Sequence, residues 1–376
     1  MAEEMRNLVS NASSRRAHIA PIRRALLSWY RHHARPLPWR ETRDPYAVWV
    51  SEVMLQQTQV ATVIPYYQRF LTAFPTLRGL AKAPLERVLE LWSGLGYYRR
   101  ARNLHRAAQL VARGSGERFP RDYAQAIELP GVGDYTARAV LSIAYNLPYF
   151  VLDGNVARVV ARLEALEGNL NQSSFRSAVE SALDGLLSRR QPGNFNQAMM
   201  ELGQTVCWPR APRCTACPVR KWCRAYRLQK AESYPEPRPR RATESRHLAV
   251  AIMRRGRKVA LMRGLDDGLM PDVWNFPGAF GGSRLAAFKR LQDKLSCWVS
   301  PATEIAARPR AQLRHGITYR SILVDLYPAE GSGRFARSSL RWFALSRLHR
   351  LATSKLALKI GASIAREPVT HRPLTR

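Results

Sequence analysis

The sequence has 376 residues, of which 46% are hydrophobic, so the chain can form packed cores and its length indicates two or three domains. The formal net charge of +32 indicates a polyanionic partner, either nucleic acid or an anionic membrane surface. No apolar run reaches about 18 residues and residues 1–20 have no apolar core, which excludes a spanning helix and a secretory signal. We therefore expect a nucleic-acid-binding protein with no membrane partner, in a reducing compartment that holds DNA, which in a bacterium is the nucleoid-containing cytoplasm.

Residues 22–230 are expected to be almost entirely helical, because apolar side chains recur there at the spacing of a helix face. The pattern is clear in four stretches, at residues 85–92, 137–144, 175–186 and 195–202. Pro84 precedes the first stretch, and proline is favoured at a helix start. These stripes predict a packed core, and we assign them no function.

Residues 129–133, Leu-Pro-Gly-Val-Gly, lie between two of these helical patterns. Glycines at alternate positions permit a tight turn whose backbone N–H groups can approach a phosphate closely. The next helix is expected to start at Asp134, with the positive end of its dipole near the same point. The segment alone also fits an ordinary helix–helix turn, but in so basic a chain it predicts a DNA-holding hairpin.

Four of the five cysteines lie within seventeen residues, in the pattern C-x6-C-x2-C-x5-C, at Cys207, Cys214, Cys217 and Cys223. Four thiolates in one short loop suit a [4Fe–4S] cluster or a zinc ion, although the two-plus-two spacing of common zinc modules is absent. The loop also carries basic side chains at Arg210, Arg213, Arg220, Lys221 and Arg224. We interpret it as a metal-pinned loop that offers positive charge to a phosphate backbone.

The composition changes after residue 230. Residues 234–241 are basic and spaced by prolines, which predicts a stiff, extended linker within residues 231–246. Beyond the linker, alternating patterns predict strands at 247–254, 258–263 and 317–327, and helical patterns predict helices at about 283–296 and 352–364. The last third of the chain is therefore expected to be a separate α+β module.

The hairpin, the segment Leu-Asp-Gly-Asn-Val at 152–156 and the cysteine pattern together resemble the helix–hairpin–helix superfamily of base-excision DNA glycosylases. Two further segments resemble, more narrowly, the adenine DNA glycosylases of the MutY type. They read L-P-W-R at 37–40, continuing to W-V-S-E-V-M-L-Q-Q-T-Q-V at 49–60, and G-L-G-Y-Y-R-R-A-R-N-L at 94–104. The resemblance is dense over residues 25–225 and continues more loosely to about residue 350.

This resemblance implies a mainly α helix–hairpin–helix glycosylase core with an iron–sulfur cluster loop, followed by a C-terminal α+β Nudix-like domain. The implied divisions are a basic tail at 1–20, a catalytic region at 21–230, a linker at 231–246, a lesion-recognition domain at 247–365 and a tail at 366–376. The catalytic region would comprise a six-helix subdomain at about 45–150 and a cluster subdomain at 21–44 plus 151–230. At the four cysteines, the resemblance favours a [4Fe–4S] cluster over zinc.

Cleavage of the bond between a purine and its deoxyribose needs a proton donor for the base and negative charge near the oxocarbenium ion. Two carboxylates in different environments can divide that work. Glu52 lies in an apolar helical run, where burial would raise its pKa, and the resemblance implies that it protonates the flipped adenine at N7. Asp153 could simply cap a helix. The resemblance implies that it stays ionised and stabilises the cation, or adds to it transiently, while water completes hydrolysis, with Asn155 and Tyr135 as orienting partners.

Tyr135 also bears on the reaction type. Relatives that cut the DNA strand carry a lysine at this hairpin position, which forms a Schiff base with the sugar. A phenol cannot form an imine. We therefore predict a monofunctional glycosylase without a β-lyase step.

Further positions are expected to contact DNA or the extracted base. Gln57 and Tyr97 match family residues that enter the duplex and fill the gap left by the flipped base, although by itself Gln57 would be plain surface and Tyr97 equally a core residue. Arg35, Trp39 and Arg40 match the segment that lines the adenine pocket. The hairpin itself supplies Leu129, Gly131 and Gly133 as DNA-binding positions.

In the C-terminal module, Trp-Asn-Phe-Pro-Gly at 274–278 resembles the W-x-F-P-G segment of Nudix-like domains. Residues 285–294 contain no glutamate to hold magnesium, so the module is expected to bind without hydrolysing. Its family role is recognition of 8-oxoguanine by a Phe-Ser-His segment, for which this chain has Leu313, Arg314 and His315. Only the histidine matches, and Arg314 could compensate by contacting a phosphate or a carbonyl oxygen. Cys297 has no partner and is expected to be a buried apolar residue.

The resemblance thus implies a monomeric enzyme that removes adenine paired with 8-oxoguanine or guanine in double-stranded DNA. Two alternatives remain. A mismatch thymine glycosylase shares the tyrosine at the hairpin position but usually lacks the C-terminal module. A catalytically silent DNA-binding protein would be expected to have lost Glu52 or Asp153, and both are present.

Overall fold

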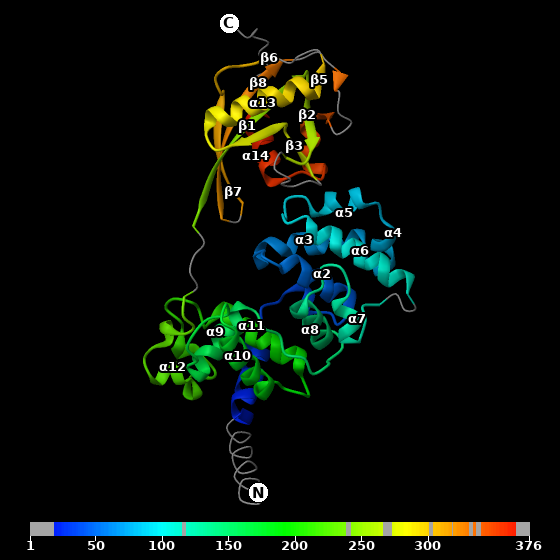
Figure 1. The fold of residues 1–376 in the computed structure, drawn as a ribbon. Helices are drawn as coiled ribbons and strands as arrows, with labels where there is room; N and C mark the ends of the chain where they lie inside the picture. Colours follow the sequence, from blue (N-terminus) through cyan, green and yellow to red (C-terminus); the bar gives the residue numbers. More distant parts are fainter. Residues whose placement is uncertain are drawn as a thin grey trace, which may run out of the picture. The chain divides into compact units, whose positions relative to one another are not determined.

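The computed structural model describes residues 19–114, 118–237, 242–265, 273–300, 304–317, 319–330, 334–335 and 340–365 (Figure 1). Most of the tail expected at 1–20, the tail at 366–376 and residues 238–241 of the expected linker lie outside the described residues. The chain forms two compact units, one of Met1–Ala81 with Arg106–Pro239 and the other of Lys82–His105 with Arg240–Arg376. Within the described ranges, none of the helices is both long and apolar enough to cross a membrane.

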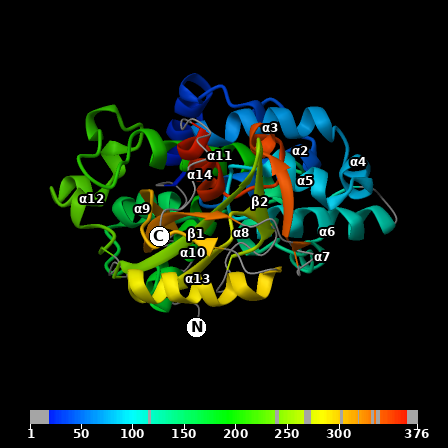
Figure 2. The same cartoon turned by 90° about the horizontal axis from the view of Figure 1, so that it is seen from above.

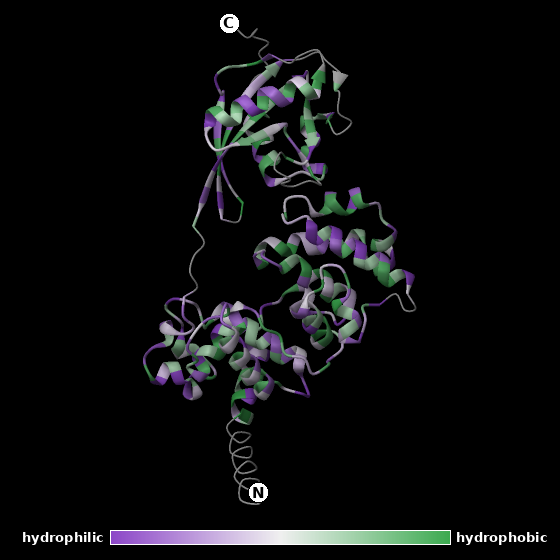
Figure 3. Cartoon of the chain, viewed as in Figure 1, coloured by the Kyte–Doolittle hydropathy of each residue, from purple (hydrophilic) through white to green (hydrophobic). Residues whose placement is uncertain are grey.

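The first unit is helical, which confirms the expectation for residues 22–230. After a helix at residues 19–33, its elements are η1 Pro38–Arg40, α2 Pro45–Leu55, α3 Val60–Ala73, α4 Leu77–Lys82, α7 Tyr123–Ile127, α8 Asp134–Ile143, α9 Gly154–Glu164, α10 Ser173–Leu186, α11 Pro192–Thr205, η2 Cys214–Ala216, η3 Arg220–Trp222, α12 Arg224–Arg227 and η4 Ala231–Ser233. Two more helices, α5 Leu85–Trp92 and α6 Arg99–Arg113, begin in the second unit. The hydrophobic and hydrophilic faces that predicted these helices are visible in Figure 3.

Two capped helix starts in this unit set the positions of Glu52 and Asp153. The carboxylate of Asp44 accepts hydrogen bonds from the backbone N–H groups of Tyr46 and Ala47, which caps α2. Asp153 caps α9 in the same way, through the N–H of Val156. The core beside α9 is built from α9, α10, α11 and the helix at residues 19–33. Helix α2 is buried over nearly its whole length, so it presents Glu52 from the interior of the unit.

The second unit contains a mixed sheet. Its strands are β1 Glu244–Arg255, β2 Lys258–Arg263, β3 Trp274–Asn275, β4 Gly278–Gly281, β6 Glu304–Ile305, β7 Ala311–Ile317, β8 Arg320–Glu330 and β10 Leu340–Ala344. The main order is β10-β2-β1-β8-β6, in which β1 and β8 are parallel and the other neighbours antiparallel. A separate pair joins β5 Val299–Ser300 to β9 Arg334–Phe335. Helices α13 Arg284–Trp298 and α14 Lys355–Ala365 pack on opposite faces of the sheet, and η6 Leu345–Arg350 precedes α14 (Figure 2).

The α+β class expected for the last third of the chain is confirmed, and so are the positions of most of its strands and helices. Two details differ. The long strand expected at 317–327 is divided, because Tyr319 lies in the turn that joins β7 to β8. The prediction that Cys297 is buried is wrong, since its side chain is exposed. Helix α13 buries Leu291, Leu295 and Trp298 against the sheet, and Cys297 points away from that stripe.

Candidate functional site

A cavity of about 590 Å³ opens in the first unit where η1, α2, α8, α9 and α11 meet. Its wall contains seven of the residues singled out from the sequence, namely Arg35, Trp39, Arg40, Glu52, Tyr135, Asp153 and Asn155. These residues come from four separate stretches of the chain, so the fold brings them together. A cavity of this size with a few convergent polar groups is typical of a small-ligand site.

Glu52 is the most perturbed acid of the cavity. Only 5% of the residue is exposed. Burial raises the pKa of its carboxyl from 4.5 to about 7, and the nearby charge of Asp153 raises it further, while a hydrogen bond with Tyr135 and the charge of Arg40 oppose the rise. Glu52 can therefore carry a proton at neutral pH.

Tyr135 lies beside Glu52 in the first turn of α8. Its hydroxyl is 3.3 Å from the Sδ atom of Met200. Burial and the charges of Glu52 and Asp153 raise the pKa of Tyr135 well above its ordinary value, so the phenol stays neutral. A neutral hydroxyl in this position can orient a carboxyl group but offers no amine for covalent chemistry.

Asp153 faces the same cavity from the start of α9. One carboxylate oxygen accepts a hydrogen bond from Val156 N at 2.7 Å and the other from Asn155 Nδ2 at 3.0 Å. Asp153 therefore caps α9, as an aspartate at a helix start would, and it also lines the cavity. Both carboxylate oxygens of Asp153 are therefore held by groups at the start of α9.

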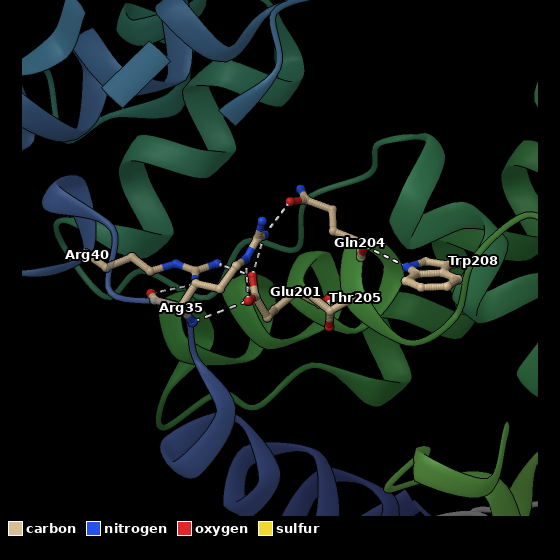
Figure 4. A network of polar contacts seen from close by, with 6 residues as sticks. All are labelled: Arg35, Arg40, Glu201, Gln204, Thr205 and Trp208. Atoms are coloured by element: carbon tan, nitrogen blue, oxygen red, sulfur yellow. Dashed lines mark hydrogen bonds and ion pairs between the residues drawn. The ribbon is translucent and has the colours of Figure 1, made fainter. Parts of the chain in front are cut away.

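One wall of the cavity is supported by an ion network around a buried carboxylate (Figure 4). The carboxylate of Glu201, whose side chain is 0% exposed, accepts Arg35 Nε at 2.6 Å and Arg40 Nη2 at 2.7 Å. Burial disfavours its charged form, but the hydrogen bonds from Arg35 and Arg40 outweigh that effect and lower the pKa of Glu201. Arg35 also donates to the side chain of Gln204 at 2.6 Å. The network ties the segment around η1 to α11 and fixes the cavity wall.

Sequence reasoning missed several residues of the cavity wall that lie on α9, on α11 or just after it: Arg158, Gln197, Met200, Gln204 and Trp208. It also missed Glu201, which pairs with the wall residues Arg35 and Arg40. The apolar stripe on α11 predicts only a packed core for this helix. The available signal was Glu201, a charged residue beside the buried stripe residue Leu202. Gly203 lets α11 approach α9, because a Cβ there would lie 2.7 Å from Asn155 Cβ.

Arg158 connects this cavity to the cysteine loop. Its guanidinium donates to Asn155 Oδ1 at 2.9 Å and to the carbonyl oxygens of Gly203, at 2.8 Å, and Cys207, at 2.9 Å. Asn155 in turn donates to Asp153. A continuous chain of hydrogen bonds therefore runs from the first cysteine of the loop to a carboxylate of the cavity.

The four cysteines of the loop are half-buried and form no disulfide. Arg162, which is 3% exposed, donates to Cys207 Sγ at 3.3 Å and to the carbonyl oxygens of Trp208 and Pro209. Burial raises the pKa of the Cys217 thiol to about 12, so a bound cation is needed to hold it as a thiolate. In the part of the chain that the structure describes, no three His, Cys, Asp or Glu side chains close around a single metal ion.

The predicted hairpin connects α7 to α8, and α8 starts at Asp134 as expected. Val132 N donates to Leu129 O at 3.0 Å, and Gly131 has a φ of 79°, which accounts for that glycine. Gly133 has an ordinary φ of −93°, and a Cβ there would meet nothing within 4 Å. Protein packing therefore does not require glycine at Gly133, whereas close approach of an external ligand would.

Gln57 and Tyr97, the two residues expected to enter the duplex, do not line the cavity. Gln57 belongs to the first unit and Tyr97 to the second. Both are exposed, and both are non-glycine residues with positive φ, 56° for Gln57 and 51° for Tyr97. Such strained backbone is concentrated at functional sites. The exposure of Tyr97, at 44%, also rules out the interpretation of this residue as core.

In the second unit, Leu313, Arg314 and His315 lie on β7 and pair with β8. Leu313 packs against the core beneath α14, while Arg314 is exposed. Burial and the neighbouring charges of Lys359 and Lys355 lower the pKa of His315. His315 is therefore kept neutral near pH 7, and Arg314 provides the exposed cation of this segment.

Comparison with known proteins gives matches over most of the chain. Residues 50–183 match the family described as "HhH-GPD superfamily base excision DNA repair protein". The adenine DNA glycosylase of Mus musculus is 35% identical over 92% of this chain and 78% of its own length, and that of Homo sapiens is 32% identical over 92% and 74%. The adenine DNA glycosylase of Buchnera aphidicola subsp. Baizongia pistaciae is 41% identical over 54% of this chain and 57% of its own length.

One solved structure is similar in fold as well as in sequence. It is a thermostable thymine-DNA glycosylase, with a TM-score of 0.51 and 28% identity over 58% of this chain and 99% of that chain. The helical glycosylase core that the sequence predicted is therefore supported by structure as well as by sequence.

Proposed function

We propose, from the premise that this chain belongs to the adenine DNA glycosylases of the HhH-GPD superfamily, that it hydrolyses the N-glycosidic bond of adenine mispaired with 8-oxoguanine or guanine. The enzyme class and the DNA substrate follow from the family; the mispair and the roles of individual residues are the proposal. The observation that carries the proposal is the pair of unlike carboxyl groups in one cavity, Glu52 with its raised pKa and Asp153 with hydrogen bonds to both oxygens.

Glu52 acts as the general acid. With a pKa of about 7 it holds a proton at neutral pH and can release it to a base nitrogen as the glycosidic bond breaks. Adenine N7 is the nitrogen that the family resemblance indicates. Protonation turns the departing base into a neutral leaving group, which lowers the barrier to cleavage.

Asp153 stabilises the positive charge that develops on the sugar. Its carboxylate is held by Asn155 and by the backbone of α9, so it does not need to reorganise when the charge appears. The cation is then captured by water, directly or after transient addition of Asp153. Tyr135 keeps the Glu52 carboxyl oriented and, because it is not a lysine, leaves the enzyme without a Schiff-base step.

The adenine itself is recognised by polar groups around the cavity. Gln197 lines the cavity with an amide, which offers a donor and an acceptor to the edge of the base. Arg35, Trp39 and Arg40 also line the cavity. Both arginines pair with the carboxylate of Glu201, so they fix the position of η1 against α11.

Delivery of the base into the cavity needs contacts with the duplex. The open hairpin at Leu129, Gly131 and Gly133 is suited to hold a phosphate, and the strained, exposed Gln57 and Tyr97 are suited to fill the space that the base leaves. Extraction of a base costs a few kcal/mol, which such contacts must supply.

The residues of the cysteine loop fit a [4Fe–4S] cluster held by Cys207, Cys214, Cys217 and Cys223. The donor set consists of four soft thiols without a disulfide, with the buried cation of Arg162 beside Cys207. When bound, the cluster fixes the path of this basic loop, and no step of hydrolysis passes through it.

The C-terminal module, proposed as residues 247–365 after a linker at 231–246, reads the base opposite the adenine. We assign contacts with the opposite strand to Arg314 and His315 on β7. The exposed guanidinium of Arg314 can donate two hydrogen bonds to a phosphate or a purine carbonyl, and a neutral His315 can accept or donate one. We also propose that residues 21–230 divide into a six-helix subdomain at about 45–150 and a cluster subdomain at 21–44 plus 151–230.

A duplex-oligonucleotide assay tests this function. Cluster-loaded monomeric protein is expected to release adenine opposite 8-oxoguanine and opposite guanine, and to release no thymine opposite guanine. Glu52→Gln should abolish release while sparing binding to the same duplexes. Release of thymine alone would favour a mismatch thymine glycosylase, and retained activity in Glu52→Gln would refute the role of Glu52.

A further inference from the structure

The loop at residues 93–98, between α5 and α6, has unusual backbone geometry. Three of its residues have positive φ, namely Gly94 at 91°, Gly96 at 84° and Tyr97 at 51°. Glycine adopts such angles readily, but a tyrosine does so only when its surroundings impose them. The conformation that exposes Tyr97 must therefore be held by neighbouring groups.

Part of that support is local. The indole N–H of Trp92 and the guanidinium of Arg100 both donate to Gly96 O, each at 3.1 Å. The Arg100 guanidinium also lies over the Tyr97 ring, 5.3 Å from its centroid, and over the Trp92 ring, 5.5 Å from its centroid. These contacts hold Gly96 and Tyr97 against the side chains of Trp92 and Arg100.

The rest of the support comes from a segment more than 250 residues away in sequence, which belongs to the same compact unit. The Tyr98 hydroxyl accepts a hydrogen bond from Gly94 N at 3.1 Å, which closes the loop, and donates to Thr353 O. Ser93 Oγ accepts from Thr353 N at 3.3 Å and donates to Thr353 O at 3.2 Å. Both ends of the loop are thus bonded to the backbone of one residue.

The hydrogen bonds of Ser93 and Tyr98 to Thr353 form a joint that is buried on both sides. Ser93 is 9% exposed, Tyr98 7% and Thr353 0%. Thr353 pairs with Trp274 as a parallel bridge, and its own hydroxyl donates to Leu348 O at 3.2 Å. Because buried hydrogen bonds are costly to leave unmade, the backbone of Thr353 holds Ser93 and Tyr98 in place.

We infer that the C-terminal module, through Thr353, is a positioning element for Tyr97. It holds the loop from both ends so that the Tyr97 ring is presented to the duplex in the strained conformation. The inference rests on the proposed role of Tyr97 in filling the gap left by the extracted base. Its consequence is that the module contributes to base extraction at every mispair, in addition to reading the opposite base.

The test uses the full-length, cluster-loaded protein. Tyr98→Phe removes the hydroxyl that joins Gly94 to Thr353, and Ser93→Ala removes the other link. Tyr145→Phe is the matched control, since it also loses a tyrosine hydroxyl bonded to a backbone carbonyl, that of Phe119, in the other unit. Extraction is followed by the fluorescence of 2-aminopurine placed at the target position, in a Glu52→Gln background that keeps the base attached.

Loss of one buried hydrogen bond at the joint is expected to lower extraction, and the single-turnover rate of adenine release, about fivefold in Tyr98→Phe and in Ser93→Ala. The reduction should be similar opposite 8-oxoguanine and opposite guanine, and absent in Tyr145→Phe. In a Tyr97→Ala background, Tyr98→Phe should add less than about twofold, because the two residues act through one step. All rates are measured well below the thermal unfolding midpoint of each variant.

An equal effect of Tyr98→Phe in the presence and absence of the Tyr97 ring would overturn the inference, since it would mark a purely structural role. A loss confined to 8-oxoguanine duplexes would overturn it as well. If Tyr97→Ala leaves extraction unchanged, the inference fails together with the role of Tyr97. Failure of the proposed function is separate, because it would show as absence of adenine release by the unmodified protein.

Discussion

Arg158 donates a hydrogen bond to Asn155 at 2.9 Å, and the same guanidinium binds the carbonyl oxygen of Cys207. Asn155 is the residue that orients Asp153. The position of the cavity carboxylate therefore depends on the cysteine loop, although the loop contributes none of its cysteines to the cavity.

The first prediction concerns this arginine. Arg158→Gln keeps some hydrogen-bonding capacity but cannot span Asn155, Gly203 and Cys207 together. We expect the single-turnover rate of adenine release to fall about tenfold, as for loss of a group that preorganises a catalytic charge. Iron content and the visible absorption of the cluster should stay unchanged. Loss of iron in parallel with activity would show that Arg158 supports the loop rather than Asp153.

The second prediction is the pH dependence of the chemical step. Glu52 must be protonated to act, and its pKa is about 7. The single-turnover rate should therefore fall as pH rises, tending to about tenfold per pH unit above that value. Quench-flow or manual sampling between pH 6 and pH 9 measures the profile. A rate that is flat up to pH 9 would contradict the acid role.

The third prediction concerns stability. The pKa of Glu52 rises from 4.5 in the unfolded chain to about 7 in the folded protein, so the folded state binds more protons in that range. Below pH 4.5, Glu52 makes its full contribution to the free energy of unfolding. That contribution falls by about 3 kcal/mol as the pH rises to about 7 and beyond. Glu52→Gln has no such loss. The free energy of unfolding in urea should increase for the variant relative to the natural protein between pH 4.5 and pH 8. If the two proteins show the same dependence on pH, the raised pKa of Glu52 is refuted.

The fourth prediction tests the reaction type. Without a lysine at the position of Tyr135, incubation with abasic product and borohydride should give no covalent complex above the background of a denatured sample. Tyr135→Lys is the informative variant, since it places an amine beside Glu52. Efficient trapping by the natural protein would show that another amine serves as nucleophile.

The fifth prediction concerns Glu201. Glu201→Gln removes the one negative charge that pairs with Arg35 and Arg40, and breaking a buried ion pair costs about 3–5 kcal/mol. We expect a loss of unfolding free energy of that order, measured by urea denaturation. Glu180→Gln is the control, because Glu180 pairs with Arg176 on the surface and such pairs contribute at most about 1 kcal/mol. Equal effects of the two variants would contradict the network.

Much of the candidate site could be predicted from local sequence. Glu52 was expected to be buried because the residues around it on α2 are apolar, and α2 is indeed buried on nearly all sides. Asp153 and Asn155 were found from one short segment, because a helix start places them together. In each case the relevant geometry is set within a few residues along the chain.

Other features depend on contacts that no single segment determines. Gln197 lies on a helix whose apolar stripe indicates core, and it faces a cavity only because α2 and α9 meet α11 there. Glu201 has its role because two distant arginines converge on it. Sequence could not decide whether Tyr97 was core or exposed, and the positive φ that identifies it is a property of the folded loop.

The contact of Gly203 with Asn155 limits how this enzyme can be redesigned. A side chain added at Gly203 would meet Asn155, whose amide donates to the Asp153 carboxylate, so we expect such a variant to shift that carboxylate. Variants that accept a bulkier base should therefore gain room elsewhere in the cavity, for example by shortening Gln197 or Met200.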